Sequence, residues 1–239
     1  MKTIAMIPAR IGSTRLKMKN LALIDGKPMI AYAIEAARNS GMFERVVVNS
    51  DHEVFQDIAK RFGADFYLRS KHLGSSSTKS DDVVLDFIQQ NPSEIVAWVN
   101  SISPLQTAGE IKQIIEYFKK ENLDSLITVK DEQVHTTYNG QPINFDLQGK
   151  FAQTQDLMPV RPFVYSIMMW KTEPFIEAMK SQGYAFFTGK VGYYPVGKLA
   201  SIIVKTEQDL KLAEFIVKAQ KANDPLQYDK VAQALFDHS

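Results

Sequence analysis

Short apolar runs alternate with amphipathic stretches along the first half of the chain, and this alternation predicts an α/β fold. The apolar runs are continuous, as expected for strands covered on both faces, and they lie at residues 3–7, 45–49, 95–99 and 125–129. Amphipathic helical stretches separate them, at residues 28–39, 54–62, 83–88 and 107–118. Because repeated β-α-β order favours parallel strands, we predict a three-layer α/β/α fold around a mostly parallel sheet.

The pattern changes in the second half of the chain. Residues 130–163 contain several glycines and prolines and little helical periodicity, which indicates a hairpin excursion or a small sub-domain. Further strands are predicted at 164–170, 191–196 and 201–204, with a helix at 172–181. The sequence Thr206-Glu207-Gln208-Asp209 is typical of a helix cap and predicts a last long helix. We therefore interpret residues 1–239 as one domain with an excursion at 130–163.

Composition narrows the possible functions. The net charge is +1, so no global field favours nucleic acid or a membrane surface, and any anion must be held by a local cluster. The chain has no cysteine, which excludes disulfides, thiolate metal sites and a cysteine nucleophile. No apolar run approaches the ~20 residues that span a bilayer. We expect a cytoplasmic protein that binds neither nucleic acid nor membrane.

The loop after the first predicted strand concentrates the chemistry. In open α/β sheets, ligands bind outside the carboxyl ends of the strands, and this loop lies there. It combines cations, hydroxyls and a glycine within a short stretch: Arg10, Gly12, Ser13, Thr14, Arg15, Lys17, Lys19 and Asn20. Glycine lets backbone N–H groups approach phosphates, and arginine binds oxyanions with two donors. The loop has neither the Walker pattern nor the Gly-x-Gly-x-x-Gly turn. It predicts a triphosphate site, and a solvated basic loop is the simpler alternative.

Longer motifs give a family resemblance. The run IPARIGSTRLKMKNLALIDGKPMIAYAIEAARNSGMFERVVVNSD, the segment SISPLQTAGEI and the stretch KVGYYPVGKLASIIVKTEQDLKLAE occur in this order. Together they resemble the CMP-sialic acid synthetases, or acylneuraminate cytidylyltransferases, which are related to the CMP-Kdo synthetases. The resemblance implies a Rossmann-like nucleotidyltransferase fold and a reaction that joins CTP to an acidic 2-keto sugar with release of pyrophosphate. It also implies Mg²⁺ at the phosphates and a homodimer formed through residues 130–163.

The resemblance assigns roles to individual residues. Two would act in catalysis, Arg10 and Lys19, and seven would bind substrate: Ser13, Arg15, Asn20, Arg69, Ser80, Asn100 and Ser103. Within the second set, Arg69 and Ser80 would contact the cytidine part. Asp51 ends the second predicted strand near the same cleft, where it would serve the site or cap the following helix.

The chain departs from the resembled family where the metal would bind. The family phrase Ser-Ile-Asp-Ile-Asp-Thr, whose aspartates serve the metal, becomes Ser-Ile-Ile-Val-Lys-Thr, with Ile203 and Lys205 in place of the carboxylates. A lysine repels a cation at that place, so Mg²⁺ is doubtful and no metal ligand is assigned. On the acceptor side, an arginine is replaced by Thr154 and an Asn-Gly pair by about Val164-Tyr165. Three hypotheses remain: an active cytidylyltransferase, a transferase with a changed nucleotide or acceptor, and a nucleotide-binding homologue without catalysis.

Overall fold

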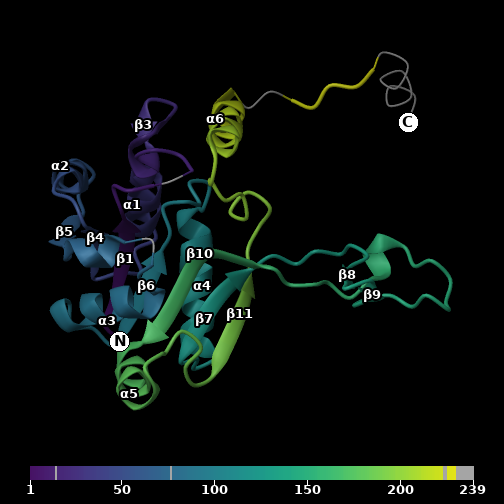
Figure 1. Cartoon of the computed structure of the whole chain (residues 1–239). Helices are drawn as coiled ribbons and strands as arrows, with labels where there is room; N and C mark the ends of the chain where they lie inside the picture. The colour runs from purple at the N-terminus through teal and green to yellow at the C-terminus, as the bar shows by residue number, and fades with distance from the viewer. Residues whose placement is uncertain (14, 76, 223–224, 230–239) are drawn as a thin grey trace.

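A seven-stranded sheet forms the centre of the protein in a computed structural model that describes all residues except 14, 76, 223–224 and 230–239 (Figure 1). Its strand order is β11-β7-β10-β6-β1-β4-β5. The strands are β1 (Thr3–Ala9), β4 (Arg45–Ser50), β5 (Asp65–Leu68), β6 (Ile95–Val99), β7 (Ser125–Val129), β10 (Phe163–Lys171) and β11 (Val191–Pro195). All neighbours pair in parallel except β10, which runs antiparallel to both β6 and β7. The predicted mostly parallel sheet is confirmed.

Helices cover both faces of the sheet. They are α1 (Met29–Asn39), α2 (Val54–Arg61), α3 (Ser80–Gln90), α4 (Ala108–Lys120) and α5 (Thr172–Gln182). A further helix, α6 (Glu207–Ala222), packs in a separate small core with Met29 and Val204. Alternate residues of β1 point to opposite faces, so Ala5 and Ile7 pack with α1, α2 and α4, whereas Ile4 and Met6 pack with α3 and α5. This alternation produces the two core layers that the continuous apolar strands predicted.

Side-chain caps fix the starts of two helices. The Thr107 hydroxyl accepts from the backbone N–H of Glu110 at 3.2 Å and caps α4. At α6, Asp209 Oδ2 accepts from the backbone N–H of Thr206 at 2.8 Å, and the Thr206 hydroxyl accepts from the Asp209 N–H at 3.3 Å. The predicted cap at Thr206 is confirmed, and it fixes the chain immediately after Lys205.

The structure corrects the sequence prediction in three places. Residues 201–204 form no strand; instead Val204 lies buried in a small core with α6, and its N–H donates to the Ile102 carbonyl at 2.8 Å. Strand β5 was missed, as was the hairpin of β2 (Leu23–Ile24) and β3 (Lys27–Pro28). The described residues also form short 3-10 helices, with η1 (Lys19–Leu21) and η2 (Lys71–Gly74) in the body and η3 (Thr154–Asp156) in the segment 130–163.

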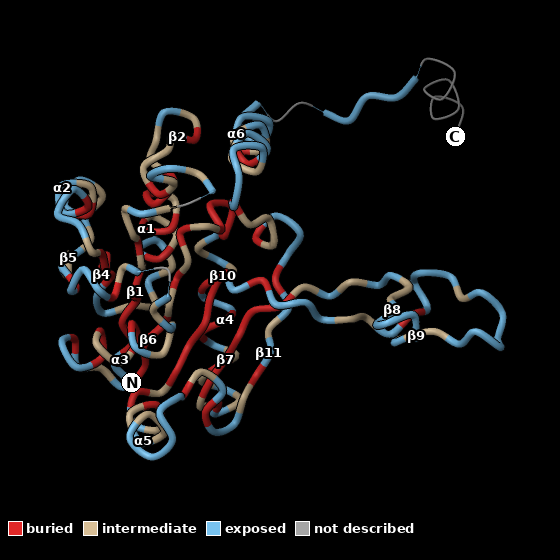
Figure 2. The backbone as a smooth tube through the Cα atoms, viewed as in Figure 1, coloured by how far each residue is buried: buried red, intermediate tan, exposed pale blue. Residues whose placement is uncertain are grey.

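Residues 130–163 leave the sheet as a long arm that projects from the body (Figure 1). The arm contains the short pair β8 (Thr137–Tyr138) and β9 (Gln141–Pro142), and most of its length is exposed (Figure 2). Its base is closed by a bridge in which Glu132 and Val160 exchange backbone hydrogen bonds of 2.9 and 3.0 Å. Within the described part of the chain, no helix has the length and apolarity to cross a membrane.

Candidate functional site

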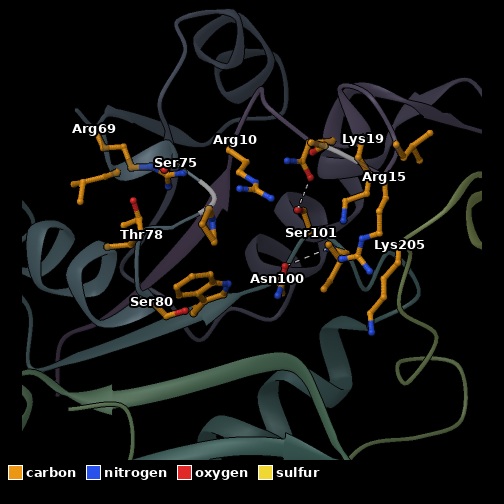
Figure 3. A pocket seen from close by; sticks show the side chains of 18 residues that line it. Arg10, Arg15, Lys19, Arg69, Ser75, Thr78, Ser80, Asn100, Ser101 and Lys205 are labelled. Carbon is orange, nitrogen blue, oxygen red and sulfur yellow. Dashed lines mark hydrogen bonds between the residues drawn. The ribbon is translucent and has the colours of Figure 1, made fainter. Parts of the chain in front are cut away.

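A cavity of about 240 Å³ opens near the carboxyl ends of β1 and β6 (Figure 3). Four parts of the chain meet there: the first loop, the segment from β5 into α3, the end of β6, and the segment before α6. Its lining consists of Pro8, Arg10, Ser13, Arg15, Leu16, Lys19, Asn20, Arg69, Leu73, Ser75, Thr78, Ser80, Val83, Trp98, Asn100, Ser101, Ile102 and Lys205. Eight of the nine predicted site residues are among them, and Ser103 is not.

Positive charge dominates this cavity. Its lining contains Arg10, Arg15, Lys19, Arg69 and Lys205, and no lining residue is a carboxylate. Partial burial and the neighbouring charges of Arg15, Arg10 and Lys205 together lower the pKa of Lys19 to about 8, against a small opposing effect of Asp209. A bound anion would relieve this repulsion, so the cavity is suited to a polyanionic ligand.

Lys19 is held in place through its own ammonium. Its Nζ donates to the Val204 carbonyl at 3.1 Å, which joins η1 to the segment before α6. The adjacent Asn20 is buried, and its Oδ1 accepts from the Ser101 hydroxyl at 2.8 Å (Figure 3). The first loop is therefore attached to the end of β6 and to the segment that carries Lys205.

Asp51 shapes the first loop from behind. Its Oδ1 accepts from the Ile11 backbone N–H at 3.1 Å, and the side chain does not line the cavity. It packs so closely on Gly74 that a Cβ there would lie 2.1 Å from Asp51 Oδ2. The alternative role as a helix cap is wrong, because the N-cap of α2 is Glu53 and no side chain caps that helix.

Arg69 is almost fully buried at the ends of two strands. It donates to the carbonyls of Asn49 at 3.0 Å and Ala9 at 3.5 Å, and burial lowers its pKa despite the nearby charge of Asp51. Among the described residues, its Nε has no hydrogen-bond partner. Arg69 therefore fixes the edge of the cavity between β1 and β4 and presents one free donor.

Hydroxyls and an indole form the opposite end of the cavity. Ser80 is the first residue of α3 and lines the cavity, and the N-cap of that helix is Lys79. Thr78 Oγ1 donates to the His72 carbonyl at 2.7 Å. Trp98 adds an apolar wall, and its Nε1 is buried without a partner in the described structure. Sequence reasoning missed Trp98 because it lies within the apolar run of β6.

Two predicted residues at the end of β6 have different environments. Asn100 lines the cavity, and its amide donates to the Tyr165 carbonyl at 3.2 Å. Tyr165 lies in a bulge of β10 with a left-handed backbone, φ 60°, in the region where the resembled family has Asn-Gly. Ser103 is buried outside the lining, and its hydroxyl donates to the Ala200 carbonyl at 2.7 Å. Ser103 therefore makes a structural contact, and its contact with substrate stays a prediction.

The acidic side chains that follow Lys205 in the sequence are already engaged. Asp209 Oδ2 accepts from the N–H groups of Lys205 and Thr206 at 2.9 and 2.8 Å, and these bonds lower its pKa. Glu207 pairs with Lys211 at 2.7 Å. Across the described residues, no group of three or more histidines and carboxylates is arranged to hold a metal ion.

Comparisons with known proteins agree with this geometry. A family model described as cytidylyltransferase matches residues 4–161. The chain is 30% identical to an N-acylneuraminate cytidylyltransferase of Streptococcus agalactiae, over 87% of this chain and 52% of the relative, and so spans about half the length of such relatives. It is 32% identical to a pseudaminic acid cytidylyltransferase of Campylobacter jejuni, over 66% of this chain and 73% of the relative. The solved structure of a CMP:2-keto-3-deoxy-manno-octonic acid synthetase complexed with CTP shares the fold, with a TM-score of 0.70, 14% identity and coverage of 92% and 100%.

Proposed function

The chain belongs to the cytidylyltransferase family, and from this premise we propose that it activates an acidic 2-keto sugar with CTP, giving a CMP-sugar and pyrophosphate. Two relatives are named for acids of this kind, N-acylneuraminate and pseudaminic acid, which supports the acceptor class. A structural neighbour was solved with CTP, which supports the nucleotide. The acceptor is sialic-acid-like or Kdo-like in this proposal.

The observation that carries the proposal is the polarity of the cavity. Arg15, Lys19 and Lys205 gather at one end, whereas Ser80 and Thr78 lie at the other (Figure 3). Arg69 also lies at this second end, where its guanidinium donates to two strand carbonyls. A nucleoside triphosphate has the same polarity, with an anionic tail and a neutral base that offers donors and acceptors. We place the β- and γ-phosphates at the cationic end and the cytidine beside α3.

The chemistry then requires positioning and charge stabilisation. A hydroxyl of the sugar acid attacks the α-phosphate, its proton leaves to solvent, and the bond from the α-phosphorus to the bridging oxygen breaks as pyrophosphate departs. Arg10 lies between the two ends of the cavity (Figure 3), where its guanidinium reaches the α-phosphate in this arrangement. Lys19 and Arg15 stabilise the charge that develops on pyrophosphate.

We also propose that the protein forms a homodimer through the arm. Several apolar side chains of the arm are solvent-exposed, with Met158 at 78%, Leu147 at 67% and Ile143 at 57%. A segment of this length with an exposed apolar surface would be covered by a second copy of the chain. The resemblance assigns the same role to this part of the sequence.

Pyrophosphate release tests the proposed reaction. CTP and a panel of sialic-acid-like and Kdo-like acids are incubated with the protein, once with Mg²⁺ and once with a chelator. Lys19→Met should lower kcat/KM by about a hundredfold, because it removes a preorganised charge at the leaving group. Lys17→Met is the matched control, because Lys17 belongs to the same loop but does not line the cavity. The proposal fails if no acid gives release and CTP raises the melting temperature no more than UTP, ATP or GTP.

A further inference from the structure

The phosphate end of the cavity does not fit the magnesium ion that the resembled family uses. Mg²⁺ requires oxygen ligands in near-octahedral geometry and is usually held by one or two carboxylates together with phosphates. No carboxylate lines the cavity, and the two positions where the resembled family has aspartates carry Ile203 and Lys205. Asp209 is nearby, but it caps α6 through three hydrogen bonds. The charged side chains at this end of the cavity are therefore positive, whereas a metal site needs negatively charged ligands.

Lys205 is built into this place by its backbone. The preceding Val204 donates to the Ile102 carbonyl at 2.8 Å and accepts from Lys19 Nζ at 3.1 Å. The N–H of Lys205 itself donates to Asp209 at 2.9 Å. The chain is thus fixed on both sides of Lys205. Within the described structure its ammonium has no salt-bridge partner, and the side chain lines the cavity (Figure 3).

The neighbouring charges make a second cation unfavourable. Lys205, Arg10 and Arg15 all act on the charge of Lys19. Three of these four cations gather at one end of the cavity, and Arg10 lies next to them. These cations would repel a divalent ion at this place as strongly as they attract phosphate, because both effects act over the same short distances. A polyphosphate without metal would instead meet all four cations with charge-assisted hydrogen bonds.

We propose that Lys205, with Arg10, Arg15 and Lys19, replaces the divalent cation, so that this site binds the polyphosphate of its nucleotide as the metal-free anion. The nucleotide identity rests on the proposed function, whereas the metal-free binding of a polyphosphate does not. The backbone on both sides of Lys205 is fixed, and from there its exposed side chain can reach the phosphates directly. The aspartates of the resembled family bring a metal cation to the phosphates. In this chain the side chain of Lys205 supplies that positive charge itself.

Calorimetric titration with inorganic tripolyphosphate and with CTP tests this, once in a chelator and once in excess Mg²⁺. The wild-type protein should bind both ligands in chelator, and Mg²⁺ should leave the affinity unchanged or weaken it. Lys205→Asp should weaken binding in chelator at least about tenfold, and Mg²⁺ should then strengthen it. Lys205→Ala should lose affinity in chelator without gaining a response to Mg²⁺.

Lys198→Asp is the matched control. Lys198 is exposed in the loop before α6 and does not line the cavity, so the same charge change there should alter the affinity less than about twofold. Since Lys205 is itself exposed, its variants should melt close to wild type. The variant with both Ile203 and Lys205 changed to aspartate should show the largest gain in affinity on addition of Mg²⁺. If that variant is unstable, the single variants decide the test.

Two results would overturn the inference: wild-type protein that binds tripolyphosphate only with Mg²⁺, or Lys205→Asp binding in chelator as tightly as wild type. The outcome is separable from the proposed function. Metal-free binding of tripolyphosphate with no preference among nucleotides would support the inference and contradict the proposed cytidylyltransferase activity. If pyrophosphate is released from CTP but the release stops completely in chelator, the proposed cytidylyltransferase activity is supported and the inference is contradicted.

Discussion

The lowered pKa of Lys19 predicts that nucleotide affinity falls with pH in a range where ordinary lysines remain charged. Burial and the charges of Arg15, Arg10 and Lys205 lower this pKa from 10.5 to about 8 in the free protein. A bound polyphosphate favours the charged ammonium and raises the pKa again. If only the charged form binds well, the apparent affinity follows the charged fraction of Lys19.

The size of the effect follows from the pKa of about 8. Roughly nine tenths of Lys19 is charged at pH 7 and roughly one tenth at pH 9, so the dissociation constant should rise about tenfold between these values. The free energy of unfolding of the ligand-free protein should change in the opposite direction. Because the pKa is lower in the folded than in the unfolded state, the contribution of Lys19 to stability rises between pH 8 and pH 10.5.

Calorimetric titration of CTP between pH 7 and pH 9 at constant ionic strength measures this dependence. Lys19→Arg is the control, because a guanidinium stays charged throughout the range and should give a nearly flat profile. Wild-type affinity that is constant within twofold would refute the reasoning. So would a Lys19→Arg profile as steep as that of the wild type, since the titrating group would then lie elsewhere.

Two further predictions concern the support of the loop and the arm. Asp51→Ala removes the acceptor for the Ile11 N–H and should raise KM for CTP about tenfold in steady-state kinetics. Asp51→Asn keeps an oxygen there and should give a KM near that of the wild type. Equal effects of both changes would exclude this role of Asp51. Leu147→Ser combined with Met158→Ser should convert the dimer to a monomer in light scattering, with Gln148→Ser as the exposed polar control. A wild-type monomer, or a double variant that stays dimeric, would contradict the second prediction.

The sequence predicted the elements whose pattern is set by burial on both sides. Strands β1, β4, β6 and β7 lie inside the sheet, and their apolar residues are continuous because helices cover both faces. Strand β5 was missed because it is a short edge strand with no fully buried residue. Residues 201–204 were wrongly predicted as a strand because Ile202 and Val204 are apolar for another reason: they pack against α6.

The cationic half of the site was also visible in the sequence, because Arg10, Arg15 and Lys19 are concentrated in one loop at the ligand-binding edge of the sheet. The other half was not visible in the same way. Trp98 was overlooked because an indole within an apolar strand has the pattern of a core residue. Arg69 carries no local signal and was placed only through the resemblance, since its role depends on strands distant in sequence.

Ser103 shows why a motif position alone could not assign a contact. Its hydroxyl donates to the Ala200 carbonyl at 2.7 Å, and one residue earlier the Ile102 carbonyl accepts from the Val204 N–H at 2.8 Å. These two bonds attach the segment after β6 to the segment that ends in Lys205. Ser103 therefore acts on the site from a distance, because it fixes the backbone that presents a lysine where the resembled family has a metal ligand. The replacement of metal by lysine needs this support, since a fixed backbone leaves only the lysine side chain to lose entropy when phosphate binds.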